Sequence, residues 1–148
     1  MNPRQMIISP IGIIHSPFQE MDETPLQSIR SQALATLEIF QEYEPGLQDI
    51  EGFSHLIILY FFHREGQTRM MVKSYLEESI HGVFATRSPR RPNHIGISTV
   101  ELIGREGNFL RVSGIDVLNG TPLLDIKPYV PKIDDRPGAR SGWLQHLW

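Results

Sequence analysis

The sequence contains no cysteine among its 148 residues. Disulfide bonds, thiolate nucleophiles and cysteine-ligated zinc sites are therefore excluded. No apolar run reaches transmembrane length, and the N-terminus lacks the apolar stretch of a signal peptide. We therefore expect a cytoplasmic protein that has no membrane partner.

The familiar short motifs for metals, nucleophiles and nucleotides are absent too. The six histidines include no His-Glu-x-x-His motif and no pair at helical separation, so we expect no bound metal ion. There is no nucleophile elbow, no glycine-rich phosphate loop and no Rossmann fingerprint. Because these short motifs are absent, motif matching alone indicates no cofactor.

What is present is typical of a globular chain. At 17.0 kDa, with 40% hydrophobic and 21% charged residues, the chain fits one domain over residues 1–148. Its formal net charge of −3 argues against a generic nucleic-acid binder but permits a local basic site. A cluster of basic residues in this mildly acidic chain would therefore indicate a local binding site for an anion.

Several short runs rich in β-branched and aromatic residues predict strands. We expect strands at residues 7–15, 35–40, 53–63, 83–86, 95–102, 108–117 and 123–126. The nearly continuous apolarity of residues 53–63 predicts a strand covered on both faces at the centre of a sheet. Residues 69–80 fit either a short amphipathic helix or an extended segment. We expect the C-terminal segment, with Trp143 and Trp148, to pack back over an exposed surface.

The connections favour a mainly β fold. Asn119-Gly120 is a strong hairpin-turn signal between the last two predicted strands. Glycine and proline turns separate many short strands, and helices do not alternate with them regularly. A small antiparallel or mixed β-barrel with one or two short peripheral helices is the predicted fold, because closure removes exposed sheet edges.

A basic loop lies between the predicted strands 83–86 and 95–102. Arg87, Arg90 and Arg91 fall within five residues, and Pro89 and Pro92 stiffen the backbone around them. Residues 82–102 carry a net charge of +2, which leaves −5 on the rest of the chain. Clustered arginines repel one another unless an anion binds them. The alternative is a solvated connection that happens to be basic.

Two carboxylates form a second candidate cluster on either side of the Asn119-Gly120 turn. Asp116 is flanked by apolar residues, so its carboxylate must be paired, hydrogen-bonded or at an open barrel end. The simpler alternative is that Asp116 caps the turn and Asp125 pairs with Lys127. Their joint appearance beside the basic loop favours a binding site.

Together these stretches resemble the TsaA-like family of S-adenosylmethionine-dependent tRNA methyltransferases. The motifs that carry the resemblance are Ile11-Gly-Ile-Ile-His-Ser-Pro-Phe, Glu51-Gly-Phe-Ser-His-Leu, Gly82-Val-Phe-Ala-Thr-Arg-Ser-Pro, Arg91-Pro-Asn-His-Ile-Gly, Asp116-Val-Leu-Asn-Gly-Thr-Pro and Asp125-Ile-Lys-Pro-Tyr. The resemblance implies a small β-barrel with peripheral helices, S-adenosylmethionine as cofactor, and a homodimer. It also implies methylation of N6 of threonylcarbamoyladenosine beside the anticodon, with the tRNA anticodon stem-loop as partner.

The resemblance also implies site residues. Those expected to contact the cofactor are Pro25, Leu26, Gln27, His63, Arg64, Arg87, Asp116, Val117, Leu118 and Asn119. Arg87 would hold the methionine carboxylate, and Asp116 would accept from a ribose hydroxyl or the amino group. Those expected to contact substrate or RNA are Arg90, Arg91, Asn93 and Lys127. No residue is identified as the general base.

Two departures and two alternatives accompany this interpretation. His94 stands where family members often have a second proline, which predicts a less rigid loop. Better-known bacterial members also carry a C-terminal extension, whereas we expect this sequence to stop near the end of the barrel. One alternative is a noncatalytic β-barrel that binds single-stranded nucleic acid through the arginine loop. The other keeps the cofactor but changes the methyl acceptor to a small molecule.

Overall fold

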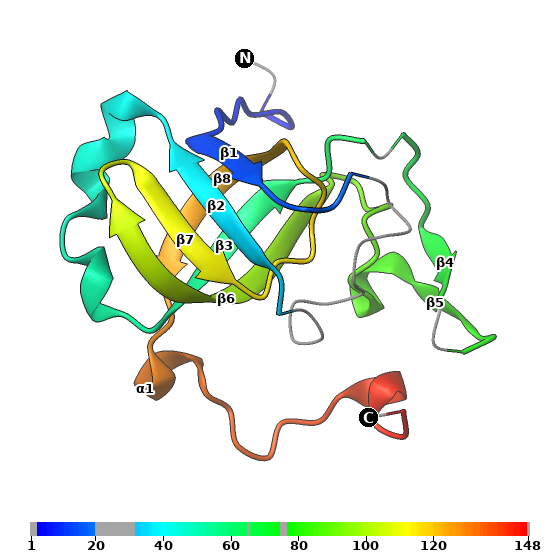
Figure 1. Ribbon diagram of the computed structural model, residues 1–148. Coiled ribbons are helices and arrows are strands. Elements are labelled where there is room, and N and C mark those ends of the chain that lie inside the picture. The colour runs from blue at the N-terminus through cyan, green and yellow to red at the C-terminus, as the bar shows by residue number, and fades with distance from the viewer. Residues whose placement is uncertain (1–2, 20–31, 65, 75–76, 148) are drawn as a thin grey trace.

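Strands whose side chains alternate between buried and exposed positions form a closed barrel. The computed structural model describes residues 3–19, 32–64, 66–74 and 77–147. Within these residues six strands close a barrel in the order β1-β2-β7-β6-β3-β8, and neighbouring strands are antiparallel (Figure 1). They are β1 (Gly12–His15), β2 (Leu34–Ile39), β3 (His55–Phe61), β6 (Ile95–Glu106), β7 (Phe109–Ser113) and β8 (Thr121–Pro128). The predicted mainly β barrel is confirmed.

Strand β3 shows how the core forms. Its inward side chains Leu56, Ile58 and Tyr60 are buried, whereas His55 and Phe61 at the two ends of its outer face are exposed. The expectation that residues 53–63 are covered on both faces is therefore wrong. A barrel has only one inner face, and β3 is instead paired along both edges, with β6 and β8. Alternation on the other strands completes the apolar core.

Shorter elements decorate the two ends of the barrel. They are η3 (Gln41–Leu47), η4 (Ile50–Gly52), β4 (Met71–Lys73), β5 (Ile80–Gly82), η5 (Val83–Ala85), α1 (Pro131–Asp134) and η6 (Gly142–Leu144). Figure 1 shows η3 and η4 at one end and the β4–β5 ribbon at the other. Of the two alternatives for residues 69–80, the extended one is correct at Met71–Lys73, which forms β4. No helix among the described residues is long and apolar enough to cross a membrane.

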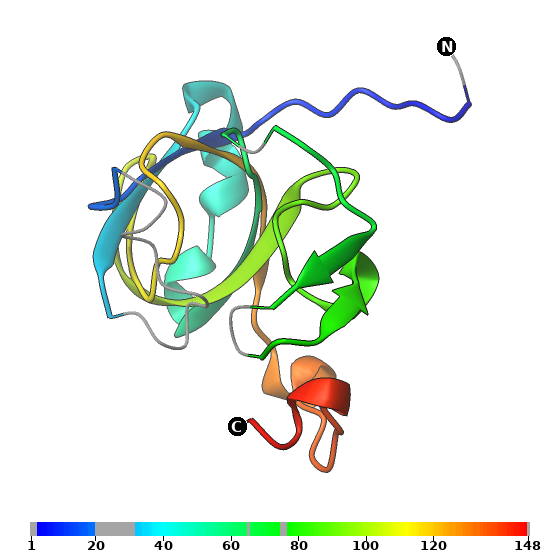
Figure 2. The same cartoon turned by 90° about the vertical axis from the view of Figure 1, so that its right-hand side faces the viewer.

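Three predicted strands are substantially shortened or replaced in the structure. The first begins only at Gly12, and the exposed residues before it lead away from the barrel (Figure 2). Residues 83–86 contain the 3-10 turn η5 rather than a strand. The strand expected at residues 108–117 ends at Ser113, because Gly114 turns the chain with a φ of 97°.

The predicted hairpin at Asn119-Gly120 is wrong. A turn does occur, since the Thr121 amide donates to the Leu118 carbonyl at 3.3 Å. However, β8 lies between β1 and β3 and does not pair with β7. The β7 hairpin partner is β6, and the chain turns between them at Gly107, whose φ is 59°. The turn signal was real, but the closure of the barrel decided which strands pair.

Candidate functional site

Three connections of the barrel, β1–β2, β3–β6 and β7–β8, meet at one end, which we call the site end. The antiparallel order makes β1, β3 and β7 finish there and β2, β6 and β8 begin there. The described residues of the connections are 16–19, 32–33, 62–64, 66–74, 77–94 and 114–120. They include most of the residues that the sequence singled out.

A buried polar cluster lies at the site end. Asp116 is 8% exposed, and its Oδ1 accepts a 2.6 Å hydrogen bond from the hydroxyl of Ser98. The Ser98 oxygen lies 2.8 Å from the Tyr60 hydroxyl, which is also 3.4 Å from Asp116 Oδ1. Burial and the negative charge of Asp116 raise the pKa of Tyr60 above its ordinary value. Tyr60 is therefore a phenol, and not a phenolate, at neutral pH.

The segment that carries Asp116 is anchored to the chain that follows β1. The Ser16 hydroxyl donates to the Val117 carbonyl at 2.7 Å, and the Asn119 side-chain oxygen accepts from the Ser16 amide at 3.0 Å. The Asn119 amide donates to the Phe18 carbonyl at 2.7 Å. The alternative that Asp116 only caps the Asn119-Gly120 turn is not supported, because its described partners lie on the barrel wall.

The arginine loop, residues 86–94, is held by its own side chains. The Thr86 hydroxyl accepts from the Ser88 amide at 3.2 Å and donates to the Val83 carbonyl at 2.8 Å. His94 has a φ of 49°, and its Nδ1 lies 2.8 Å from the Pro89 carbonyl oxygen. Proline cannot adopt that φ, so His94 fixes this loop in a way that a second proline could not.

The three arginines have different surroundings. The positive charge of Arg87 acts to lower the pKa of Tyr60, against burial, so its guanidinium lies within electrostatic reach of the buried cluster. Arg91 uses Nη1 to donate to the carbonyls of Thr86 and Ser88, at 3.0 and 3.1 Å. Arg90 is exposed, and its side chain has no hydrogen bond or ion pair with any described residue. The three arginines are therefore not equivalent: the guanidinium of Arg91 holds the loop itself, whereas that of Arg90 is exposed to solvent.

His63 and Arg64 follow β3 directly into the site end. Arg64 Nη1 donates to the Gln19 carbonyl at 2.9 Å, so it joins the connection after β3 to the one after β1. Partial burial, and then the charge of Arg64, lower the pKa of His63. Pro25, Leu26 and Gln27 lie outside the described residues.

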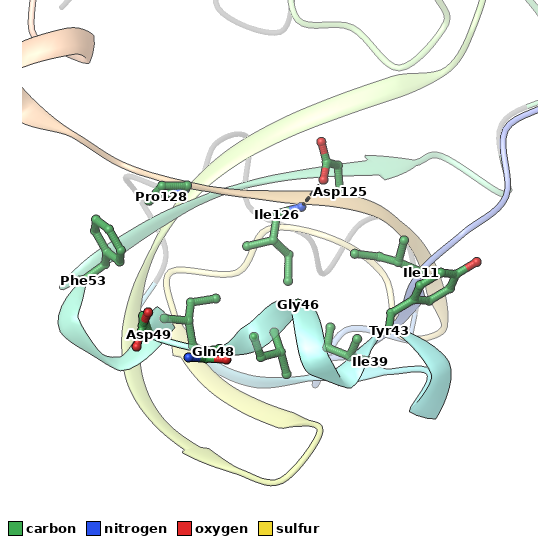
Figure 3. Close-up of a pocket in the computed structure, with 12 residues that line it drawn as sticks. Ile11, Ile39, Tyr43, Gly46, Gln48, Asp49, Phe53, Asp125, Ile126 and Pro128 are labelled. Atoms are coloured by element: carbon green, nitrogen blue, oxygen red, sulfur yellow. Dashed lines mark hydrogen bonds between the residues drawn. The ribbon is translucent and has the colours of Figure 1, made fainter.

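Lys127 and Asp125 do not belong to the site end. Both lie in the second half of β8, and Lys127 Nζ pairs with Asp125 Oδ2 at 3.2 Å. Asp125 borders a hollow of about 390 Å³ between η3 and β8, at the opposite end of the barrel (Figure 3). The expectation that Asp125 joins Asp116 is wrong, and the simpler ion pair with Lys127 is correct. The structure thus places Lys127 away from the other predicted substrate residues.

The C-terminal segment braces the connection that carries the arginine loop. Trp143 stacks on His81, and its indole N–H donates to the Ala85 carbonyl at 2.8 Å. His81 in turn lies 2.6 Å from Glu77. The expected return of this segment onto the protein surface is confirmed at Trp143, while Trp148 lies outside the described residues.

Sequence reasoning missed Tyr60 and Ser98. Both were hidden in apolar strands, although Ser98 was detectable as a hydroxyl at an inward position between Gly96 and Val100. Gly96 is opposite Tyr60 in the β3–β6 register, where a β-carbon would clash with Cε2 of the Tyr60 ring and lie 2.7 Å from Cζ of Phe62. The glycine thus leaves room for the tyrosine whose hydroxyl reaches the cluster.

Comparison with known proteins identifies relatives over most of the chain. Residues 13–135 match the family described as "tRNA-methyltransferase O N-terminal domain". A probable S-adenosyl-L-methionine-binding protein of Pyrococcus abyssi is 52% identical over 144 residues, which are 97% of this chain and 78% of that protein. A human tRNA (adenine(37)-N6)-methyltransferase is 41% identical over 137 residues, which are 87% of this chain and 31% of the human protein.

A solved structure has the same fold. The crystal structure of TrmO from Pseudomonas aeruginosa matches with a TM-score of 0.79 at 42% identity, covering 93% of this chain and 62% of that one. The present chain thus spans most of the archaeal relative, but less than two thirds of the crystallised protein and about a third of the human one.

Proposed function

Because this chain belongs to the tRNA-methyltransferase O N-terminal domain family, we propose that it methylates tRNA with S-adenosylmethionine as methyl donor. The acceptor we propose is N6 of the adenosine beside the anticodon, carrying the threonylcarbamoyl group. Relatives described as S-adenosyl-L-methionine-binding proteins and as tRNA (adenine(37)-N6)-methyltransferases support the cofactor and the adenine N6. A tRNA substrate also supports the expected cytoplasmic location.

The observation that carries the proposal is the meeting of a cation and a buried carboxylate at the site end. Arg87 lies on the connection before β6 and Asp116 on the connection before β8, almost thirty residues apart, and the antiparallel strand order brings both connections to the same end of the barrel. The charges of both side chains act on Tyr60, that of Arg87 more weakly. In our proposal, Arg87 binds the methionine carboxylate through charge-assisted hydrogen bonds. Asp116 accepts from a ribose hydroxyl or the adenine amino group. His63, Arg64 and the segment 117–119 line the same end. Family resemblance alone assigns Pro25, Leu26 and Gln27 to the cofactor.

The reaction is an in-line displacement. The N6 nitrogen attacks the methyl carbon, the bond from that carbon to sulfur breaks, and the sulfur leaves with the electron pair as S-adenosylhomocysteine. The N6 proton departs to a base that we do not assign. Positioning of donor and acceptor supplies most of the acceleration in such a transfer, so the chain's task is to hold both reactants in line.

For tRNA we assign the first contacts to Arg90 and Asn93, which are exposed on the arginine loop. Arg91 remains a candidate, although its guanidinium already holds two loop carbonyls. Lys127 stays a separate prediction, since it lies away from the loop and pairs with Asp125. Phosphate contacts of this kind position RNA and weaken as salt is added.

We also propose a homodimer, because one arginine loop on a chain of formal charge −3 offers little basic surface. Exposed apolar side chains beside the loop support it: Met70, Met71, Ile80 and Phe84 are between 50% and 76% exposed. Light scattering at micromolar concentration tests this directly, and a species of 17.0 kDa that methylates at full rate would contradict it.

Methyl transfer from radiolabelled S-adenosylmethionine to tRNA tests the enzyme proposal, with the product nucleoside identified by mass spectrometry. We expect incorporation into tRNA that carries threonylcarbamoyladenosine and none into tRNA lacking that group. Equal incorporation into both tRNAs would refute the requirement for the threonylcarbamoyl group. No incorporation despite cofactor binding would refute tRNA as the methyl acceptor.

The noncatalytic single-strand binder remains a second candidate for one reason. Phe84 is 76% exposed in η5, directly before the arginine loop, where it can stack on an unpaired base. Calorimetry distinguishes the two functions, because this alternative binds unmodified single-stranded RNA tightly and S-adenosylmethionine not at all.

A further inference from the structure

We infer that Ser98 and Tyr60 are positioning residues, which hold the Asp116 carboxylate in the orientation that receives the cofactor. The inference rests on the proposed binding of S-adenosylmethionine at the site end. It concerns two residues of the barrel wall that do not themselves touch the cofactor in our proposal.

The hydrogen bonds have a defined direction. An ionised carboxylate only accepts, so the single hydroxyl proton of Ser98 is committed to Asp116 Oδ1, at 2.6 Å. The Ser98 oxygen, 2.8 Å away, is then the nearest acceptor for the Tyr60 hydroxyl, since Asp116 Oδ1 and the Ile97 carbonyl oxygen each lie 3.4 Å from it. The result is a one-way chain from Tyr60 through Ser98 to Asp116. Such chains are strengthened by mutual polarisation in a low-dielectric interior.

Burial makes this chain restrictive. Tyr60 is 2%, Ser98 3% and Asp116 8% exposed, and no buried side-chain polar atom of the described residues lacks a partner. The raised pKa of Tyr60 keeps its donor proton in place. Removing either hydroxyl therefore changes how the carboxylate is held, since little water reaches these atoms to replace it.

The arrangement joins a rigid part of the fold to a connection. Ser98 and Tyr60 lie on β6 and β3, which pair along seven residues of β3, whereas Asp116 lies on the connection between β7 and β8. A buried carboxylate is expensive, and an apolar residue would fill the same space at lower cost. We conclude that the wall hydroxyls are there to orient the carboxylate, as precise sites require.

Calorimetric titration with S-adenosylmethionine tests the inference on Ser98→Ala, Tyr60→Phe and Asp116→Asn. We expect Asp116→Asn to weaken binding at least tenfold, and each hydroxyl deletion to weaken it about three- to tenfold. In Ser98→Ala/Asp116→Ala we expect no loss beyond that of Asp116→Ala alone, because Ser98 acts through the carboxylate. Tyr60→Phe keeps the ring that packs near Gly96, so it carries the test if Ser98→Ala does not fold.

The matched control is Asn108→Ala, at the opposite end of the barrel. Asn108 is 9% exposed and its side-chain amide donates to the Ile39 carbonyl at 2.6 Å, so its loss also removes a buried hydrogen bond. We expect this variant to unfold at lower temperature but to bind the cofactor like the unaltered protein.

Steady-state kinetics separate positioning from mere destabilisation. A positioning role raises KM for S-adenosylmethionine in Ser98→Ala and Tyr60→Phe while kcat stays within twofold. A merely structural role lowers the active fraction, which lowers kcat and leaves KM unchanged. That second pattern, or cofactor affinities equal to that of Asn108→Ala, overturns the inference while the proposed function stands. If the unaltered protein binds no S-adenosylmethionine, the proposed function fails and the inference fails with it.

Discussion

The indole of Trp143 lies nearly parallel to the imidazole of His81, with ring centroids 4.0 Å apart and planes inclined by 13°. The two residues are far apart in the sequence, and their contact joins the C-terminal segment to β5. The same indole donates to Ala85, two residues before Arg87. The C-terminal segment thus restrains the base of the arginine loop.

Trp143→Ala is expected to loosen this connection. Loss of the stacking and of one hydrogen bond lowers the free energy of opening this segment by about 1–2 kcal/mol. Hydrogen exchange of the Val83 amide, which donates to the Met70 carbonyl at 2.8 Å, should accelerate. Trp143→Phe is the control, because it keeps an aromatic ring that can stack on His81 but is smaller than the indole and lacks its N–H, and we expect an intermediate rate. Unchanged exchange in Trp143→Ala would show that the brace contributes nothing.

Arg87→Ala is expected to weaken S-adenosylmethionine binding while the protein stays folded. The side chain is exposed, so its removal opens no cavity, but a lost charge-assisted hydrogen bond costs about 1.5–3 kcal/mol of binding free energy. Calorimetry measures the change. Arg90→Ala removes the same charge from the same loop and should leave cofactor affinity unchanged while lowering tRNA affinity. Equal cofactor affinity in both variants would exclude Arg87 as a cofactor ligand.

Gly96→Ala is expected to damage both stability and cofactor binding. Its β-carbon would clash with Cε2 of the Tyr60 ring and lie 2.7 Å from Cζ of Phe62, so the tyrosine must move and its hydroxyl with it. Overpacking of this kind costs about 1–3 kcal/mol of unfolding free energy. Gly104→Ala is the control on the same strand, since nothing lies within 4 Å of its β-carbon. Urea unfolding and calorimetry should separate the two variants clearly.

His63 is expected to make the folded protein less stable as the pH falls. Its pKa is lowered by partial burial and by the charge of Arg64, so the unfolded chain binds the proton more readily. As the pH falls below the unfolded pKa, near 6.5, protonation of the unfolded chain lowers the free energy of unfolding. Above that pH the histidine is neutral in both states and the effect disappears. His63→Gln should flatten the decline in melting temperature between about pH 8 and pH 5. An identical pH profile in both proteins would contradict the shift.

Much of the fold was predictable from patterns of adjacent residues. The alternation of Ala35, Leu37 and Ile39 predicted β2, and the apolar run after Phe53 predicted β3. Boundaries failed where a single residue redirected the backbone, as at Gly114. The hairpin at Asn119-Gly120 failed for a different reason: a turn motif specifies a reversal of the chain but not the strand that pairs next.

The site was predictable in part. Family resemblance singled out Arg87 and Asp116, and the structure brings both within electrostatic reach of Tyr60. Asp125 and Lys127 had similar local signals, yet they form an ion pair with each other away from the site end. A short motif records which chemical groups are present, and only the register of β8 decides at which end of the barrel they lie.

The sequence alone therefore determined the residue types, the period-two core and the basic character of the loop, because these depend on near neighbours. Tertiary structure decided that Tyr60, Ser98 and Asp116 share hydrogen bonds across 56 and 18 residues of chain. It also decided that Trp143 reaches Ala85. Contacts of this kind arise from barrel closure, which brings distant strands into register, and no pattern of adjacent residues encodes them.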